Sequence, residues 1–176
     1  EFFCDTPWYV AQPHRVVLVE RDETYVYSPS TLWLMVGDRT RAQVTRSRAA
    51  LAHKGIELVR GTVEAIDPAA RSVRVDGNTY QGDYVVIALG AELVPDLVPG
   101  LATAGYDLYS LSGMERLRDD RTAFVAGRIA IVVAGLPFKC PAAPNEAALL
   151  LEADLRRRGV RENCEIALYT PEPGPM

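Results

Sequence analysis

The stretch "GRIAIVVAGLPFKCPAAPNEAALLLEADLRRRG", residues 127–159, predicts a strand, a turn and a helix in succession. The apolar run after Gly127 is continuous, which is typical of a strand covered on both faces of a parallel sheet. Pro144 stands in the first turn of the helix, arginines fill its last turn, and Gly159 ends it. A second strand, "CEIALYTPEP", follows at Cys164, so this stretch predicts a βαβ unit.

The preceding residues predict another α/β passage. A continuous strand at Val16–Val19 ends at Glu20, and further strands are expected at 56–61 and 82–90. Residues 62–80 alternate with period two on both sides of a turn, which predicts an antiparallel β-meander. Helices are expected from Ser30 or Thr31, over 41–54 with Val44 and Leu51 inward, arginines outward and Gly55 as cap, and from a serine cap over Ser112–Asp119.

The predicted fold class is therefore α/β, a three-layer arrangement around a mainly parallel sheet with an inserted β-meander. We expect a first domain over residues 14–126 and the start of a second over 127–176, with residues 1–13 unassigned. The chain begins at Glu1 and stops in a loop after a strand, so we expect a fragment truncated at both ends.

Composition narrows the class of partners. The 176 residues are 48% hydrophobic and 24% charged with a net charge of −4, so no basic footprint for nucleic acid is present. No apolar run has the roughly 20 residues of a membrane-spanning helix, and no secretory signal is visible. Location stays open between cytoplasmic, peripheral membrane and periplasmic.

Cysteine usage points to a single position of interest. Cys4, Cys140 and Cys164 form no CxxC pair, and no Cys/His cluster has zinc spacing, so no metal site is expected. Cys140 lies just before a predicted helix N-terminus and follows Lys139, which favours a thiolate and hence a reactive thiol. The alternative is a small cysteine packed in a turn. Cys164 is expected to be structural, and Cys4 has no assignable role.

Several positions suggest a nucleotide site. Glu20 ends a strand, where an acidic side chain bonds ribose hydroxyls in nucleotide-binding sheets, although a solvated strand end explains it equally well. Ser28 and Ser30 either face a cofactor or begin a helix. Gly90 ends a strand and permits a close approach to a ligand or simply a turn. The glycine-rich turn that should precede Glu20 is absent from residues 1–13.

The turn after the strand at Gly127 is poorly suited to a dinucleotide. It holds one glycine, Gly135, and three prolines that offer no N–H to a phosphate: Pro137, Pro141 and Pro144. NAD is therefore not expected at this turn.

The segments "GLPFKCPAAPNEAALLLEADLRRRG" and "EIALYTPEPGPM" resemble the sulfide:quinone oxidoreductase and flavocytochrome c sulfide dehydrogenase group. This group belongs to the FAD-dependent pyridine nucleotide-disulfide oxidoreductase superfamily. "VVLVERDETYVYSPSTLWLMVGDR", "GIELVRGTVEAID" and "GDYVVIALGAEL" resemble FAD-domain segments of the same group. The resemblance runs from about His14 to Met176, and it implies an FAD/NAD(P)-binding Rossmann-like fold.

The resemblance implies FAD as cofactor, with Glu20 on the adenosine ribose and Cys140 as a redox cysteine that takes up sulfide sulfur. Electrons would pass through FAD to a quinone or a cytochrome, and membrane attachment would use only a C-terminal part absent from this chain. The expected cofactor-binding positions are Glu20, Arg21, Ser28, Pro29, Ser30, Val63, Ala88, Leu89 and Gly90.

Two alternatives remain open at this point. One is an NAD(P)H:quinone or ferredoxin-type flavoreductase in which Cys140 is structural. The other is a truncated, non-catalytic fragment that binds no flavin.

Overall fold

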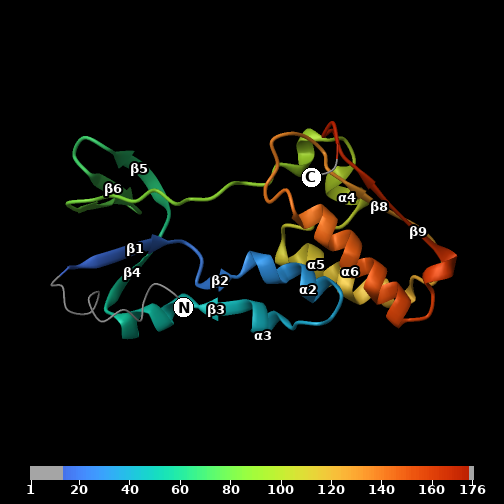
Figure 1. Cartoon of the computed structure of the whole chain (residues 1–176). Coiled ribbons are helices and arrows are strands. Elements are labelled where there is room, and N and C mark those ends of the chain that lie inside the picture. Colours follow the sequence, from blue (N-terminus) through green and yellow to red (C-terminus); the bar gives the residue numbers. More distant parts are fainter. Residues whose placement is uncertain (1–13, 175–176) are drawn as a thin grey trace. The chain divides into compact units, whose positions relative to one another are not determined.

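The computed structural model describes residues 14–174, which form two compact units (Figure 1). Unit 1 consists of residues 14–25 and 46–89, and unit 2 of residues 26–45 and 90–174. This division differs from the expected domain limits of 14–126 and 127–176, which stay a prediction. Cys4 and the unassigned residues 1–13 lie outside the described part of the chain.

Unit 1 is built on a pair of parallel strands. β1 (Val16–Glu20) pairs with β4 (Ile56–Arg60), with Glu20 opposite Arg60 at the carboxyl end. The 3₁₀ helix η2 (Arg48–Lys54) precedes β4, and Gly55 ends it at a φ of 74° while its N–H bonds the Ala52 carbonyl. The predicted cap at Gly55 is therefore confirmed.

An antiparallel meander completes unit 1. β5 (Val63–Asp67), β6 (Ser72–Val75) and β7 (Asn78–Gln81) pair in sequence order, as the period-two pattern predicts. Val75 is its buried residue, only 2% exposed. A further strand pair joins β2 (Thr24–Val26) to β3 (Thr45–Ser47).

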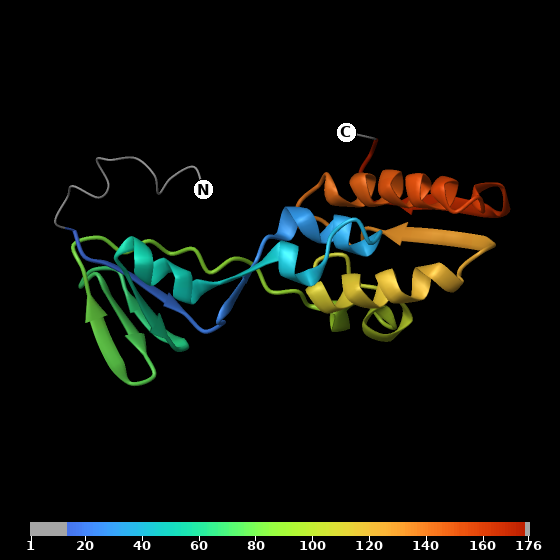
Figure 2. The same cartoon turned by 90° about the horizontal axis from the view of Figure 1, so that it is seen from below.

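Unit 2 contains the βαβ unit that the sequence predicts from Gly127 onward. β8 (Gly127–Val132) and β9 (Cys164–Tyr169) are parallel, and α6 (Ala143–Arg157) packs against both (Figure 2). Pro144 lies in the first turn of α6, and Gly159, with a φ of 72°, follows its last turn. The predicted βαβ unit, with Pro144 and Gly159 at the ends of its helix, is therefore confirmed.

The core of unit 2 joins segments distant in sequence. α2 (Thr31–Met35) packs on both α5 (Leu111–Asp120) and α6, and Leu34, Met35 and Met114 are fully buried. The remaining elements are short: η1 (Ser28–Ser30), α3 (Arg41–Val44), η3 (Pro95–Leu97), α4 (Leu101–Ala104), η4 (Arg121–Ala123) and η5 (Arg161–Asn163).

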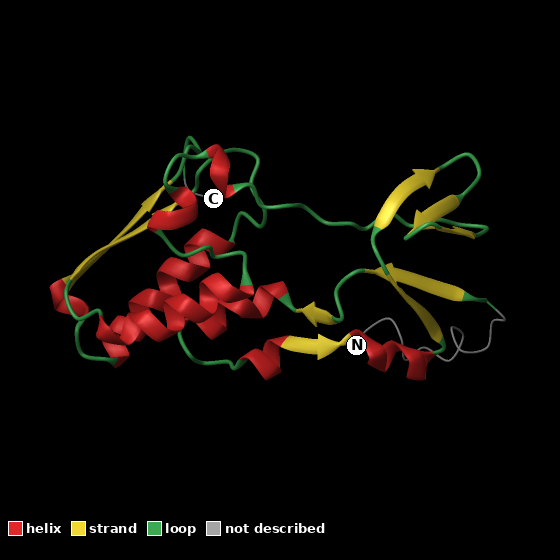
Figure 3. Ribbon diagram, turned by 180° about the vertical axis from the view of Figure 1, so that it is seen from behind, coloured by secondary structure: helices red, strands yellow, loops and turns green. Residues whose placement is uncertain are grey.

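Two predicted elements are wrong. The helix expected over 41–54 is split into α3, β3 and η2, because residues 45–47 extend to pair with β2. The strand expected over 82–90 is a loop (Figure 3), and Val86 is 88% exposed. Within residues 14–174 no strand pairs with this segment in a sheet, so its backbone is not part of a hydrogen-bonded ladder.

The predicted serine caps also need correction. α2 does begin at Thr31, but the Ser30 side chain makes no capping bond; instead Thr31 Oγ1 donates to the Ser28 carbonyl at 2.7 Å. α5 is capped by Ser110 rather than Ser112. No helix within residues 14–174 has the length and apolar character needed to cross a membrane.

Candidate nucleotide and redox site

The carboxylate of Glu20 lies at the carboxyl end of β1 and is held through both oxygens. Oε1 accepts a hydrogen bond from the backbone N–H of Asp22 at 3.2 Å, and Oε2 lies 2.7 Å from Arg48 Nη2 in an ion pair. The Glu20 side chain is 27% exposed and that of Arg48 only 14%. The carboxylate is therefore fixed in orientation and still open to a ligand.

Arg48 is anchored on several sides. Its backbone N–H donates to the Glu23 carbonyl at 3.0 Å, and Nη1 donates to the Asp22 carbonyl at 3.1 Å. Its guanidinium lies 5.7 Å from the ring centroid of Tyr25, within cation–π range. These contacts tie the start of η2 to the loop that follows β1.

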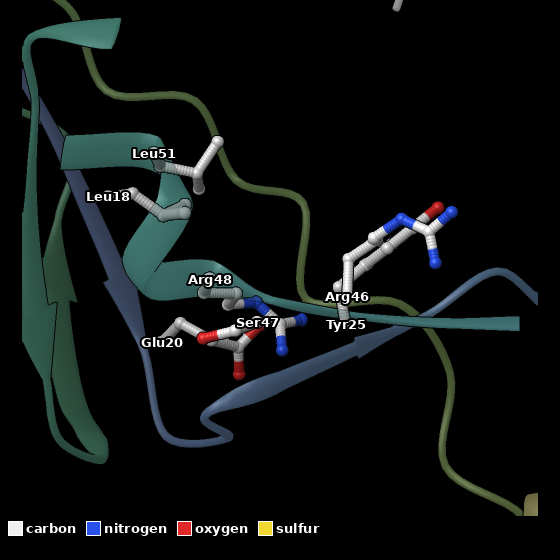
Figure 4. Close-up of a pocket in the computed structure, with 7 residues that line it drawn as sticks. All are labelled: Leu18, Glu20, Tyr25, Arg46, Ser47, Arg48 and Leu51. Carbon is white, nitrogen blue, oxygen red and sulfur yellow. Dashed lines mark ion pairs between the residues drawn. The ribbon is translucent and has the colours of Figure 1, made fainter. Parts of the chain in front are cut away.

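A pocket of about 350 Å³ opens beside this ion pair (Figure 4). Its walls are mainly apolar and combine β1, β2, β3 and η2. In the figure the Glu20 carboxylate faces the Arg48 guanidinium, and the side chains of Leu18 and Leu51 lie together on one side of the pocket. The lining residues are Leu18, Glu20, Tyr25, Arg46, Ser47, Arg48 and Leu51.

The expected cofactor residues divide between the two units. Unit 1 holds Glu20, Arg21, Val63, Ala88 and Leu89, and unit 2 holds Ser28, Pro29, Ser30 and Gly90.

Of those in unit 1, Glu20 alone lines the pocket. Arg21 is exposed beside Asp22, Val63 begins β5, and Ala88 and Leu89 lie in the exposed loop where a strand end was expected. In unit 2, Ser28 to Ser30 form η1, and Gly90 follows the same loop with a φ of 77°. Their role toward a cofactor stays a prediction.

Cys140 lies exposed in the turn between β8 and α6. Its φ is 55°, a left-handed conformation uncommon outside glycine, and its carbonyl accepts the N–H of Ala143, the first residue of α6. The thiol is thus accessible just before the helix, as the sequence predicts. Cys164 is buried at the start of β9, in keeping with a structural role.

Tyr109 is a neighbour of Cys140 that the sequence did not indicate. Burial raises the pKa of Tyr109 above its ordinary value, and the negative charges of Cys140 and then Asp107 raise it further. The Tyr109 hydroxyl is buried and has no hydrogen-bond partner among the described residues. Cys140 therefore has in its electrostatic surroundings a tyrosine whose hydroxyl is buried and whose pKa is raised.

The sequence pattern also gave no indication that Arg48 and Tyr25 belong to the site. The expected helix over 41–54 placed its arginines outward, whereas the side chain of Arg48 is largely buried against Glu20. The available signal was the polar run Thr45–Ser47, which begins with the β-branched Thr45 and interrupts the helical pattern. Among residues 14–174, no group of three or more His, Cys, Asp or Glu side chains is placed to hold a metal ion.

A carboxylate at the carboxyl end of a parallel strand, beside an apolar pocket, is how open α/β sheets bind nucleosides. The fold is that of a dinucleotide-binding α/β protein. The sequence model of the pyridine nucleotide-disulphide oxidoreductase family matches residues 8–137, and the chain belongs to that family. Its members are FAD-binding flavoproteins, in agreement with the expected cofactor.

Individual relatives agree with the expected group. The chain is 27% identical over 163 residues to the mitochondrial sulfide:quinone oxidoreductase of Mus musculus, covering 88% of this chain and 36% of the relative. It is 26% identical over 174 residues to an alternative NAD(P)H-ubiquinone oxidoreductase of Arabidopsis thaliana, covering 87% and 33%. The resemblance to sulfide:quinone oxidoreductases is thus confirmed.

The solved structure of the sulfide:quinone oxidoreductase from Aquifex aeolicus superposes with a TM-score of 0.75 at 23% identity, over 87% of this chain and 37% of that one. This likeness confirms the expected FAD/NAD(P)-binding Rossmann-like fold. The chain spans about a third of the length of these relatives.

Proposed function

We propose that the protein containing this chain is an FAD-dependent oxidoreductase that oxidises sulfide or a related sulfur donor and passes the electrons to a quinone. The observation that carries the proposal is the similarity to sulfide:quinone oxidoreductases across most of the chain, together with the exposed thiol of Cys140 in the turn before α6. A cytochrome is the alternative acceptor within the same proposal.

The residues of the Glu20 pocket fit the adenosine half of FAD. Leu18, Leu51 and Tyr25 offer apolar surface to a purine, and the Glu20 carboxylate offers acceptors to ribose hydroxyls. FAD, when bound, would supply an acceptor for two electrons. The other expected cofactor contacts are proposed for each unit by itself: Arg21, Val63, Ala88 and Leu89 in unit 1, and Ser28, Pro29, Ser30 and Gly90 in unit 2.

Cys140 is the proposed sulfur carrier. A thiolate at Sγ that combines with hydrosulfide forms one S–S bond and releases one proton and two electrons, leaving a persulfide on the cysteine. The exposure of Cys140 permits a small anion to reach Sγ in the turn before α6.

The test is sulfide-dependent quinone reduction by the whole protein. Cys140→Ser is expected to lower kcat at least about a hundredfold, since the nucleophile is lost. Cys164→Ser, at the buried cysteine, is the matched control and is expected to keep most of the activity. Full activity in Cys140→Ser would rule out the proposed role.

A second candidate is an NAD(P)H:quinone reductase, favoured by the similarity to the Arabidopsis thaliana NAD(P)H-ubiquinone oxidoreductase. The turn after β8 opposes it, because Pro137, Pro141 and Pro144 remove N–H groups that a dinucleotide phosphate would need. Quinone reduction by NADH but not by sulfide, unchanged in Cys140→Ser, would establish this candidate instead.

A further inference from the structure

We propose that Arg48 is a positioning residue that orients the Glu20 carboxylate to receive a vicinal diol, such as the two hydroxyls of an adenosine ribose. The inference rests on the proposed function, in which the adenosine half of FAD binds at Glu20. It adds a role for a side chain on η2, 28 positions after the carboxylate in the sequence.

The orientation follows from how the two oxygens of Glu20 are used. An ionised carboxylate has about two acceptor sites on each oxygen. The Asp22 N–H uses one site on Oε1, and Arg48 uses one on Oε2. Because each oxygen is held by a different donor, the carboxylate cannot rotate freely, and it can present one further acceptor site on each oxygen.

Arg48 is rigid enough to impose that orientation. Its guanidinium is held by Glu20 and the Asp22 carbonyl while lying over Tyr25, and its backbone is bonded to Glu23. The loop carrying these groups is the one that leaves β1, so Arg48 restrains both the carboxylate and its backbone. Binding of a diol costs less entropy when both acceptors are already held in place than when binding must first order them.

The rest of the pocket suits the nucleoside that such a diol belongs to. The pocket of about 350 Å³ has Leu18 and Leu51 beside the ion pair, which can cover a purine face while Glu20 holds the sugar. Arg15 likewise pairs with a glutamate of unit 1, since its guanidinium donates to both carboxylate oxygens of Glu57, but it is exposed and does not line this pocket. Arg15 is therefore the matched control for Arg48.

The experiment compares adenosine with 2′-deoxyadenosine in NMR titrations of the isotope-labelled 176-residue chain. The wild-type chain is expected to bind adenosine about tenfold more tightly, since a hydrogen bond to a charged group is lost with the 2′-hydroxyl. Arg48→Met is expected to bring the two affinities within about twofold while leaving the affinity for 2′-deoxyadenosine unchanged. Arg15→Met should keep the wild-type preference.

Arg48→Lys covers the case in which the methionine variant does not fold. A lysine retains the charge but cannot bond Glu20 and the Asp22 carbonyl with one planar group, so part of the diol preference should be lost. The amide signal of Asp22 reports directly on the hydrogen bond to Glu20 Oε1 in each variant. It is expected to shift in the Arg48 variants and not in Arg15→Met.

Three results would overturn the inference: no binding of adenosine by the wild-type chain, an unchanged preference in both Arg48 variants, or an equal loss of affinity for both nucleosides, which indicates a merely structural role. FAD binding and sulfide oxidation are measured separately in the whole protein. If both persist while any of these results holds, the inference about Arg48 fails and the proposed function stands.

Discussion

At the scale of single residues, the surroundings of Cys140 contain a tyrosine that titrates abnormally. The pKa of Tyr109 is raised first by burial and then by the charges of Cys140 and Asp107. Because the neutral phenol is favoured in the folded chain, the folded state binds this proton more tightly than the unfolded state. The resulting stability is complete below the unfolded pKa of about 10 and is lost as pH rises through the higher folded value.

Removing the thiol is therefore expected to make Tyr109 easier to ionise. In Cys140→Ser the pKa of Tyr109 should fall toward its ordinary value but not reach it, since burial remains the larger cause. The measurement is the tyrosinate absorbance in an alkaline titration, with Tyr109→Phe in each background to isolate this one tyrosine. Cys164→Ser should leave the titration unchanged; an equal shift there would disprove the link to Cys140.

Single positions differ in how far the sequence reveals them. Glu20 and Cys140 could be found because each stands at a junction, a strand end or a helix start, where local pattern and chemistry coincide. Arg48, Tyr25 and Tyr109 could not, because their roles depend on partners distant in the chain. Tyr109 comes 31 positions before Cys140, and no local pattern marks it as a neighbour.

At the scale of elements, the sequence predicts what local rules decide and fails where tertiary pairing overrides them. The strand–helix–strand of β8, α6 and β9 is confirmed because its apolar runs, Pro144 and Gly159 all agree. The helix expected over 41–54 is broken because Thr45–Ser47 pairs with β2. Its helical propensity is weak at the β-branched Thr45, so pairing in the sheet prevails.

The N-terminus of α5 offers a direct test of such local rules. Ser110 Oγ accepts the Gly113 N–H at 3.1 Å, whereas Ser112 is exposed and makes no capping bond to α5. Ser110→Ala is expected to lower the free energy of unfolding of unit 2 by about 1 kcal/mol, because a helix donor loses its acceptor. Denaturant unfolding followed by circular dichroism measures this change.

Ser112→Ala is the matched control, because the sequence pattern alone places the cap there. It is expected to change the free energy of unfolding by less than about 0.5 kcal/mol, as at most exposed positions. If Ser112→Ala is the more damaging substitution, α5 begins at Ser112 and the observed cap is wrong.

At the scale of the whole molecule, the segment Gly82–Gly90 carries the largest conflict between sequence and structure. Its apolar run reads as a strand covered on both faces, yet Tyr84, Val86, Ile87 and Leu89 are all exposed. A strand needs neighbours to bond its backbone, and β1 and β4 form a sheet of two strands among the described residues. The apolar pattern therefore predicts a buried strand, whereas the side chains of this segment are exposed among the described residues.

Substitutions at two valines decide whether this segment is exposed in solution. Val86→Lys is expected to change the free energy of unfolding of unit 1 by less than about 0.5 kcal/mol, because the side chain is already in water. Val75→Lys, on the neighbouring meander, should cost at least about 3 kcal/mol, because it buries an unpaired charge at a site 2% exposed. Hydrogen exchange measured by mass spectrometry shows whether each loss of stability occurs in unit 1. In the wild-type chain, the amides of the loop should exchange much faster than those of β1 and β4. If Val86→Lys instead destabilises the chain as much as Val75→Lys, the segment is buried after all, and the strand that the sequence predicts forms against a partner outside residues 14–174.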